Sequence, residues 1–130
     1  MSALTDRLLH HGVSETIEAL VSVQETLRSL PARHPARAVT DPEVRTVQEQ
    51  ITPVCDIIDN AVAALRTGRD PAGNSLARAQ VGAGLQHLVD DCRGEQFTAV
   101  MLVGLDADGG SEFQRLVDEL GRLAARLRRS

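Results

Sequence analysis

Hydrophobic residues recur along most of this chain at alternating spacings of three and four, the repeat of an amphipathic helix. The clearest such pattern lies in residues 42–67. Asp41 and Pro42 supply the cap and first residue of this predicted helix, and Gly68 supplies its end. Pro53 lies inside the pattern, so we expect a kink over residues 49–53 without a break. The apolar positions of this seam are Val44, Val47, Ile51, Val54, Ile58, Ala61 and Leu65.

The N-terminal segment carries a second apolar stripe. Ser2 can cap a short helix over 3–11 that Gly12 interrupts, and Ser14 can cap a further helix over 15–30 that Pro31 ends. Residues 3–30 could instead form one bent helix, and residues 31–41 are predicted to be a loop. The stripe consists of Ile17, Leu20, Val21, Leu27 and Leu30, and the polar Gln24 falls on it.

Three segments follow in the second half of the chain. Asn74 or Ser75 can cap a helix over 75–93, in which Gly82 and Gly84 would allow another helix to approach closely. Residues 95–105 contain strand-favouring residues, but a strand here needs a partner across a dimer, so we expect a short buried helix. Residues 106–110 are predicted to be a loop before a last helix. The apolar positions of the two longer helices are Val81, Leu85, Leu88 and Cys92, then Phe113, Leu116, Leu120, Leu123 and Leu127.

The start of the last helix is predicted at Ser111, with Gln114 three residues on completing a capping box. Taken together, the patterns predict an all-α fold with four main helices plus one or two short helices in a bundle, forming a single domain over 1–130. The two heptad seams offer more apolar surface than one chain needs. We therefore expect a homodimer.

Composition narrows the function classes. The 130 residues have a net charge of −4 and two aromatic residues, which argues against nucleic acid and anionic membranes as partners. All 14 basic residues are Arg, which we attribute to a GC-rich bacterial genome. The longest apolar run, Ala99–Val103, is too short to cross a membrane, and no signal peptide is evident. We expect a cytoplasmic protein in which Cys55 and Cys92 are buried thiols.

The basic cluster near the C-terminus is predicted to be a solvated helix end, where cations complement the helix dipole. Its members are Arg122, Arg126, Arg128 and Arg129. The four histidines show no metal-ligand spacing, so no metal or cofactor is expected. These histidines are His10, His11, His34 and His87.

Two short strings resemble known families. Gly73-Asn74-Ser75-Leu76 resembles the pantetheine-attachment motif of acyl and peptidyl carrier proteins, and the resemblance implies that Ser75 would carry the phosphopantetheine arm. The same serine also suits an ordinary helix cap. The segment 48–53 resembles the phosphoacceptor helix of sensor histidine kinases. Gln48 stands where that family has its histidine, which excludes phosphotransfer there.

Three hypotheses follow for function. The first is an interaction protein that homodimerises and binds a protein or peptide partner through an apolar groove. The second is a small enzyme without a linear motif, acting on a peptide or natural product at a dimer interface, with His87 and Gln24 as candidate catalytic residues. The third is a carrier-like domain modified on Ser75.

Overall fold

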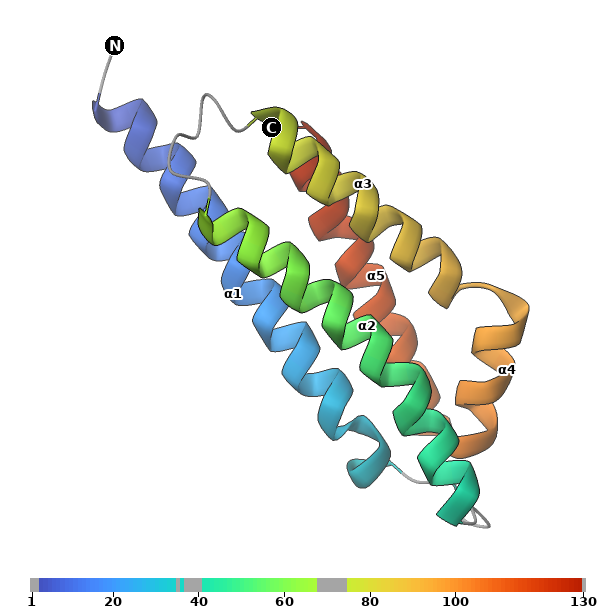
Figure 1. Ribbon diagram of the computed structural model, residues 1–130. Coiled ribbons are helices and arrows are strands. Elements are labelled where there is room, and N and C mark those ends of the chain that lie inside the picture. The colour runs from blue at the N-terminus through green and yellow to red at the C-terminus, as the bar shows by residue number, and fades with distance from the viewer. Residues whose placement is uncertain (1–2, 35, 37–40, 68–74, 130) are drawn as a thin grey trace.

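The computed structural model describes residues 3–34, 36, 41–67 and 75–129. Within these ranges the chain forms five helices and no strand (Figure 1). Four helices are long and one is short, which confirms the predicted all-α bundle and the helical alternative for residues 95–105. The helices are α1 (Ala3–Arg33), α2 (Asp41–Thr67), α3 (Ser75–Cys92), α4 (Glu95–Gly104) and α5 (Ala107–Arg129).

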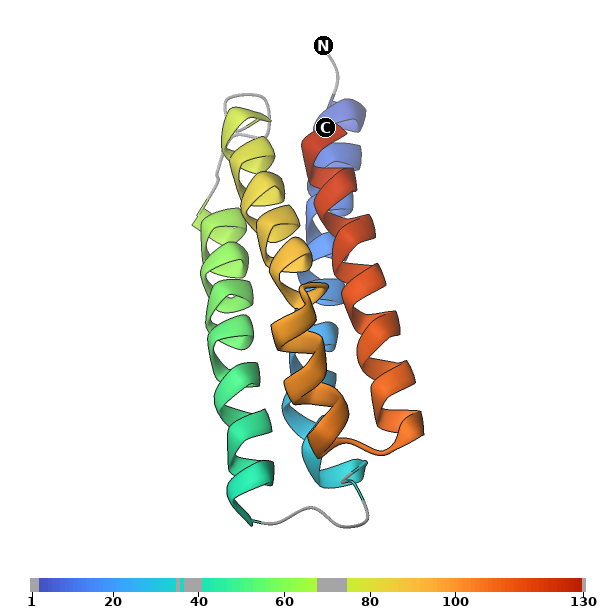
Figure 2. The same ribbon diagram turned by 90° about the vertical axis from the view of Figure 1, so that its right-hand side faces the viewer.

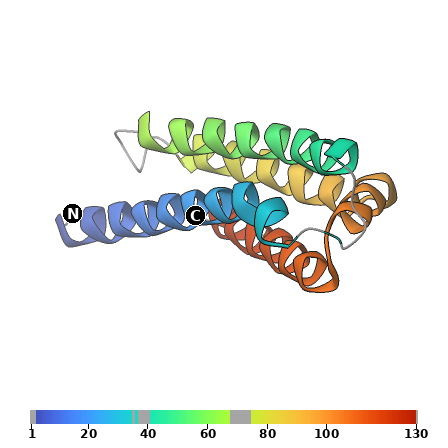
Figure 3. The ribbon, with the colours of Figure 1, turned by 90° about the horizontal axis from the view of Figure 1, so that it is seen from below.

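The four long helices run alternately up and down the bundle. α1 packs against α2 and α5, and α3 packs against the same two helices, so neighbours in the bundle are antiparallel (Figures 1 and 2). Seen from below, α2 and α3 form one layer and α1 and α5 the other (Figure 3). α4 follows α3 along the same side and packs against α2, α3 and α5.

The structure confirms the alternative of a single helix over residues 3–30 and corrects its end. α1 is one continuous helix that passes through Gly12 and includes Pro31. A glycine inside a helix costs only about 1 kcal/mol, less than the burial of the apolar stripe below it contributes. Pro31 lies in the last turn, where it removes a single backbone bond. The chain closes that turn with the His34 amide, which donates to the Leu30 carbonyl oxygen at 3.0 Å.

The α2 seam is buried as predicted, from Val47 to Leu65; the side chain of Val44 lies outside the described residues. α2 continues through Pro53, whose ring lies on the exposed face. On the turn before the proline, the Thr52 hydroxyl donates to the Gln48 carbonyl oxygen at 3.0 Å. The helix therefore keeps one seam in phase along its whole described length.

The two glycines of α3 differ in their surroundings. A Cβ atom on Gly82 would lie 2.8 Å from the Ala124 backbone oxygen and 2.8 Å from Cγ of Arg128, so α5 approaches α3 closely at this point. A Cβ atom on Gly84 would meet nothing within 4 Å. The predicted close approach is thus confirmed at Gly82 and is wrong at Gly84, because Gly84 faces away from α5 toward open space.

The last helix begins earlier than its sequence predicts. α5 starts at Ala107 instead of after Ser111, because Asp106 is its cap. The Gly109 amide donates to Oδ1 of Asp106 at 2.6 Å, and the Gly110 amide donates to the Asp106 carbonyl oxygen at 2.9 Å. The two glycines suggest a loop in sequence, but a Cβ on Gly109 would lie 2.6 Å from Cβ of His34. Glycine is required here by close packing.

The core is aliphatic, and its two aromatic rings meet at one end. Phe97 of α4 stacks on Phe113 of α5 with ring centroids 5.7 Å apart and planes inclined by 20°. Met101 of α4 is also fully buried. The short helix therefore completes the core at the end of the bundle that α3 does not reach.

Candidate functional site

Gln24 joins α1 to α2 inside the bundle. It is 5% exposed, and its Nε2 donates to the Cys55 carbonyl oxygen at 2.9 Å and to Oδ1 of Asp59. In return the Cys55 thiol donates to the Gln24 carbonyl oxygen at 3.8 Å. On the outer side, Arg28 pairs with Asp59 at 3.4 Å. The polar residue on the predicted stripe therefore forms an interhelical hydrogen-bond network.

Both cysteines are buried and unpaired, as predicted. Burial raises the pKa of the Cys55 thiol, and the nearby Arg28 guanidinium offsets part of that increase. Burial, with a smaller contribution from the Asp91 charge, raises the pKa of Cys92 to about 12. A nucleophilic cysteine needs a thiolate, so these environments disfavour nucleophilic chemistry at either sulfur.

The structure does not bring the other sequence candidates together. His87 of α3 is exposed, whereas Gln24 lies in the core between α1 and α2. Ser75 is the first residue of α3, but its side chain, like those of His10 and His11, lies outside the described residues. Among the described residues, no group of three or more His, Cys, Asp or Glu side chains is placed to hold a metal ion.

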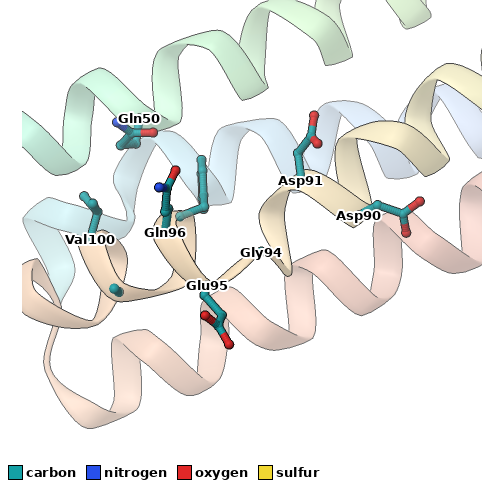
Figure 4. A pocket seen from close by; sticks show the side chains of 9 residues that line it. Gln50, Asp90, Asp91, Gly94, Glu95, Gln96 and Val100 are labelled. Carbon is teal, nitrogen blue, oxygen red and sulfur yellow. The ribbon is translucent and has the colours of Figure 1, made fainter.

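A pocket of about 920 Å³ lies between α2 and the corner where α3 meets α4 (Figure 4). Its carboxylates come from Asp90, Asp91 and Glu95, and they point in different directions. Gln50 of α2 and Gln96 of α4 line the opposite part of the pocket. Because the three carboxylates diverge, the pocket does not offer the convergent ligands that a cation site needs.

A second hollow runs between α2 and α3 on the outer face of the bundle. It has a volume of about 340 Å³ and a mostly apolar lining, and we call it the α2–α3 groove. Ile57 on its rim is 40% exposed. Its polar members, Asn60 and Gln80, are uncharged. The lining residues are Ile57, Asn60, Ala61, Ala64, Gln80, Val81, Gly84 and Leu85.

The end of α1 is tied to the start of α5 by charged groups. Arg33 donates to both carboxylate oxygens of Glu112, at 3.1 and 3.2 Å. His34 places Nε2 3.0 Å from Oε2 of Glu112 and Nδ1 3.5 Å from Oδ1 of Asp106. The pKa of Glu112 is lowered mainly because Arg33 donates hydrogen bonds to its carboxylate.

From the contacts of Glu112 with Arg33 and His34, we predict that the folded protein loses stability in acid. The pKa of Glu112 is lower in the folded state than in the unfolded state, so its contribution is present above its ordinary pKa and is lost as pH falls through the folded value. We expect Glu112→Gln to lower the thermal midpoint at pH 6 and to have a smaller effect near pH 3. Circular dichroism melts across that range test this, with Arg33→Gln as the reciprocal variant. An equal effect of Glu112→Gln at both pH values would contradict the assignment.

In comparisons with protein families, curated proteins and solved structures, nothing matches this chain. The fold and the groove therefore define it only as an all-α helical bundle with an open apolar face. In the described part of the chain, no helix combines the length and apolar character needed to cross a membrane.

Proposed function

We propose that this protein is a non-enzymatic interaction protein that homodimerises and binds a protein or peptide partner through the α2–α3 groove. The observation that carries the proposal is the composition of that groove: an apolar hollow with an exposed isoleucine on its rim and no charged residue in its lining. The centres of protein interfaces are likewise depleted of charged residues.

The groove has the shape that a helix needs. Ala61, Ala64 and Gly84 are small, and the space above Gly84 is open. Small residues allow the backbone of a second helix to approach, and larger apolar side chains at the rim then pack beside it. Ile57 and Val81 are such side chains, one from each helix.

A second copy of this chain supplies a matching surface. A twofold axis brings the same patch of both copies together, so a protruding side chain on one helix needs a hollow on another. The groove contains both, Ile57 on α2 and the open space above Gly84 on α3. A helical partner protein would use the same complementarity.

Sedimentation velocity over a range of concentrations tests the proposal. We expect a dimer whose dissociation constant rises at least about 10-fold in Ile57→Asp, because a charge would be desolvated at the interface. Gly84→Leu should weaken it similarly by filling the hollow. Val103→Asp is the matched control: Val103 is 60% exposed on α4, away from the groove. A chain that stays monomeric and binds no protein of its host contradicts the proposal.

The two alternatives remain open hypotheses with separate tests. If the protein is an enzyme at a dimer interface, Gln24→Ala and His87→Ala should abolish its activity. If it is a carrier-like domain, intact mass spectrometry should show a covalent adduct that Ser75→Ala removes. The proposed setting is the cytoplasm of a bacterium with a GC-rich genome, supported by the two free thiols and by the use of Arg alone as the basic residue.

A further inference from the structure

Arg78 is a buried arginine without a visible counterion. It lies at the end of the first turn of α3 and is 6% exposed. Its Nε atom is fully buried and has no hydrogen-bond partner. Within residues 3–34, 36, 41–67 and 75–129, no carboxylate forms an ion pair with its guanidinium.

Burying a charged side chain costs free energy unless a counterion or hydrogen bonds compensate for the lost hydration. A guanidinium stays protonated in proteins, so it cannot escape burial by losing its charge. Arginine is rarely buried to this extent unless it is paired. An oxygen anion that accepts hydrogen bonds from Arg78 would remove this imbalance, and the planar guanidinium suits carboxylate or phosphate.

Among the described residues, the ends of α2 and α5 and the start of α3 carry basic residues and no acidic ones. α3 has no acidic residue before Asp90, α2 has none after Asp59, and α5 has none after Glu119. The start of α3 and the end of α5 lie together at one end of the bundle (Figures 1 and 2). α1 contributes acidic residues near this end, of which Glu15 and Glu18 are exposed. The arginines at this end are Arg66, Arg78, Arg126, Arg128 and Arg129.

Arg128 lies next to the turn that carries Arg78. Its Cγ and backbone nitrogen would be 2.8 and 3.1 Å from a Cβ on Gly82, one turn after Arg78 on the same helix. The stem of the Arg128 side chain thus crosses α3 where Gly82 has no side chain, and Arg128 is an exposed residue. The positive end of the α3 helix dipole adds to the positive charge of these arginines, because the first backbone N–H groups of a helix have no partner within it.

We propose that this end of the bundle is a binding site for an oxyanion, a phosphate or carboxylate group of a small molecule or partner. Arg78 is its buried ligand, Arg128 is a ligand at the rim, and the N-terminal turn of α3 faces the anion. The site is separate from the α2–α3 groove and does not depend on the function proposed for that groove.

Thermal unfolding with inorganic phosphate as the probe tests the site. Ionic strength is kept constant with sodium chloride. At a phosphate concentration about 100-fold above the dissociation constant, we expect the thermal midpoint of the wild-type protein to rise by roughly 5–10 °C. Arg78→Met retains the apolar stem and removes the charge, so this rise should disappear.

The same variant gives a second readout in the absence of phosphate. Replacing an arginine whose buried Nε has no partner by an apolar side chain of similar length should leave the thermal midpoint unchanged or higher. A structural arginine with an internal partner would behave in the opposite way, and Arg78→Met would then be less stable than the wild type. That result, together with no response of the wild type to phosphate or acetate, would overturn the proposal.

Two further variants locate the anion. Arg128→Met should reduce the phosphate-dependent rise without abolishing it, since Arg128 lies at the rim. Arg122→Met is the matched control, because Arg122 is on the same helix and pairs with Glu119. A rise that survives in Arg78→Met but disappears in Arg122→Met would place the anion elsewhere and contradict the assignment. A stronger response to acetate than to phosphate would identify the ligand as a carboxylate.

Discussion

Replacing Ile58 by alanine should lower the free energy of unfolding by about 2–5 kcal/mol. Ile58 is 0% exposed and lies at the centre of the α2 seam, where that helix packs on the rest of the core. The substitution removes buried methylene groups and leaves a cavity that the surrounding helices can fill only in part. Urea denaturation followed by circular dichroism measures the loss.

The neighbouring isoleucine is the matched control for this prediction. Ile57 is the same residue type on the same helix and is 40% exposed, so Ile57→Ala should cost less than about 1 kcal/mol. Both variants place alanine, a good helix former, in α2, so their difference reports burial instead of helix propensity. Equal losses in the two variants would show that the α2 seam does not face the core.

Gly82→Ala should destabilise the bundle by about 1 kcal/mol, although alanine is the better helix former. The new methyl group would lie 2.8 Å from the Ala124 backbone oxygen, so α3 and α5 must move apart or the helices must distort. Because the nearest atom belongs to the backbone, we take the middle of the usual steric cost, about 2 kcal/mol, which exceeds the gain in helix propensity of about 1 kcal/mol. Chemical denaturation at low protein concentration keeps self-association out of the comparison.

Gly84→Ala provides the opposite expectation on the same helix. A Cβ there meets nothing within 4 Å, so only the propensity gain remains. This variant should therefore be more stable than the wild type by about 0.5–1 kcal/mol. If both alanine variants stabilised the protein, the close packing of α3 on α5 at Gly82 would be refuted.

The helix content and the buried seams could be predicted from the sequence, because both depend on the local spacing of apolar residues. The period of apolar residues in 42–67 identifies α2 and its buried face, and the structure confirms both. The cap predicted at Asp41 concerns a side chain outside the described residues. The stripe of α5 is likewise buried at Phe113, Leu120, Leu123 and Leu127. Periodicity describes one face of one helix, and that face is buried in any bundle.

Helix ends were harder to predict at glycine and proline residues that lie inside a helix because of tertiary packing. Gly12 and Pro31 are breakers by propensity, yet both lie inside α1, because the burial of the helix outweighs their local cost. Gly109 suggests a loop, but its hydrogen atom in place of a side chain leaves room for His34. The cap at Asp106 was missed for the same reason, since two glycines follow it in what is the first turn of α5.

The sequence by itself determined the class of fold, the helix seams that supply much of the core and the burial of the two cysteines, because these follow from composition and from the period of the apolar positions. Only the tertiary structure decided the partners of the polar residues. Gln24 meets Cys55 and Asp59 across 31 and 35 residues of chain, and Arg78 is buried with no partner for its Nε atom. Hydrogen bonds and counterions depend on which helices become neighbours, and no local spacing specifies that.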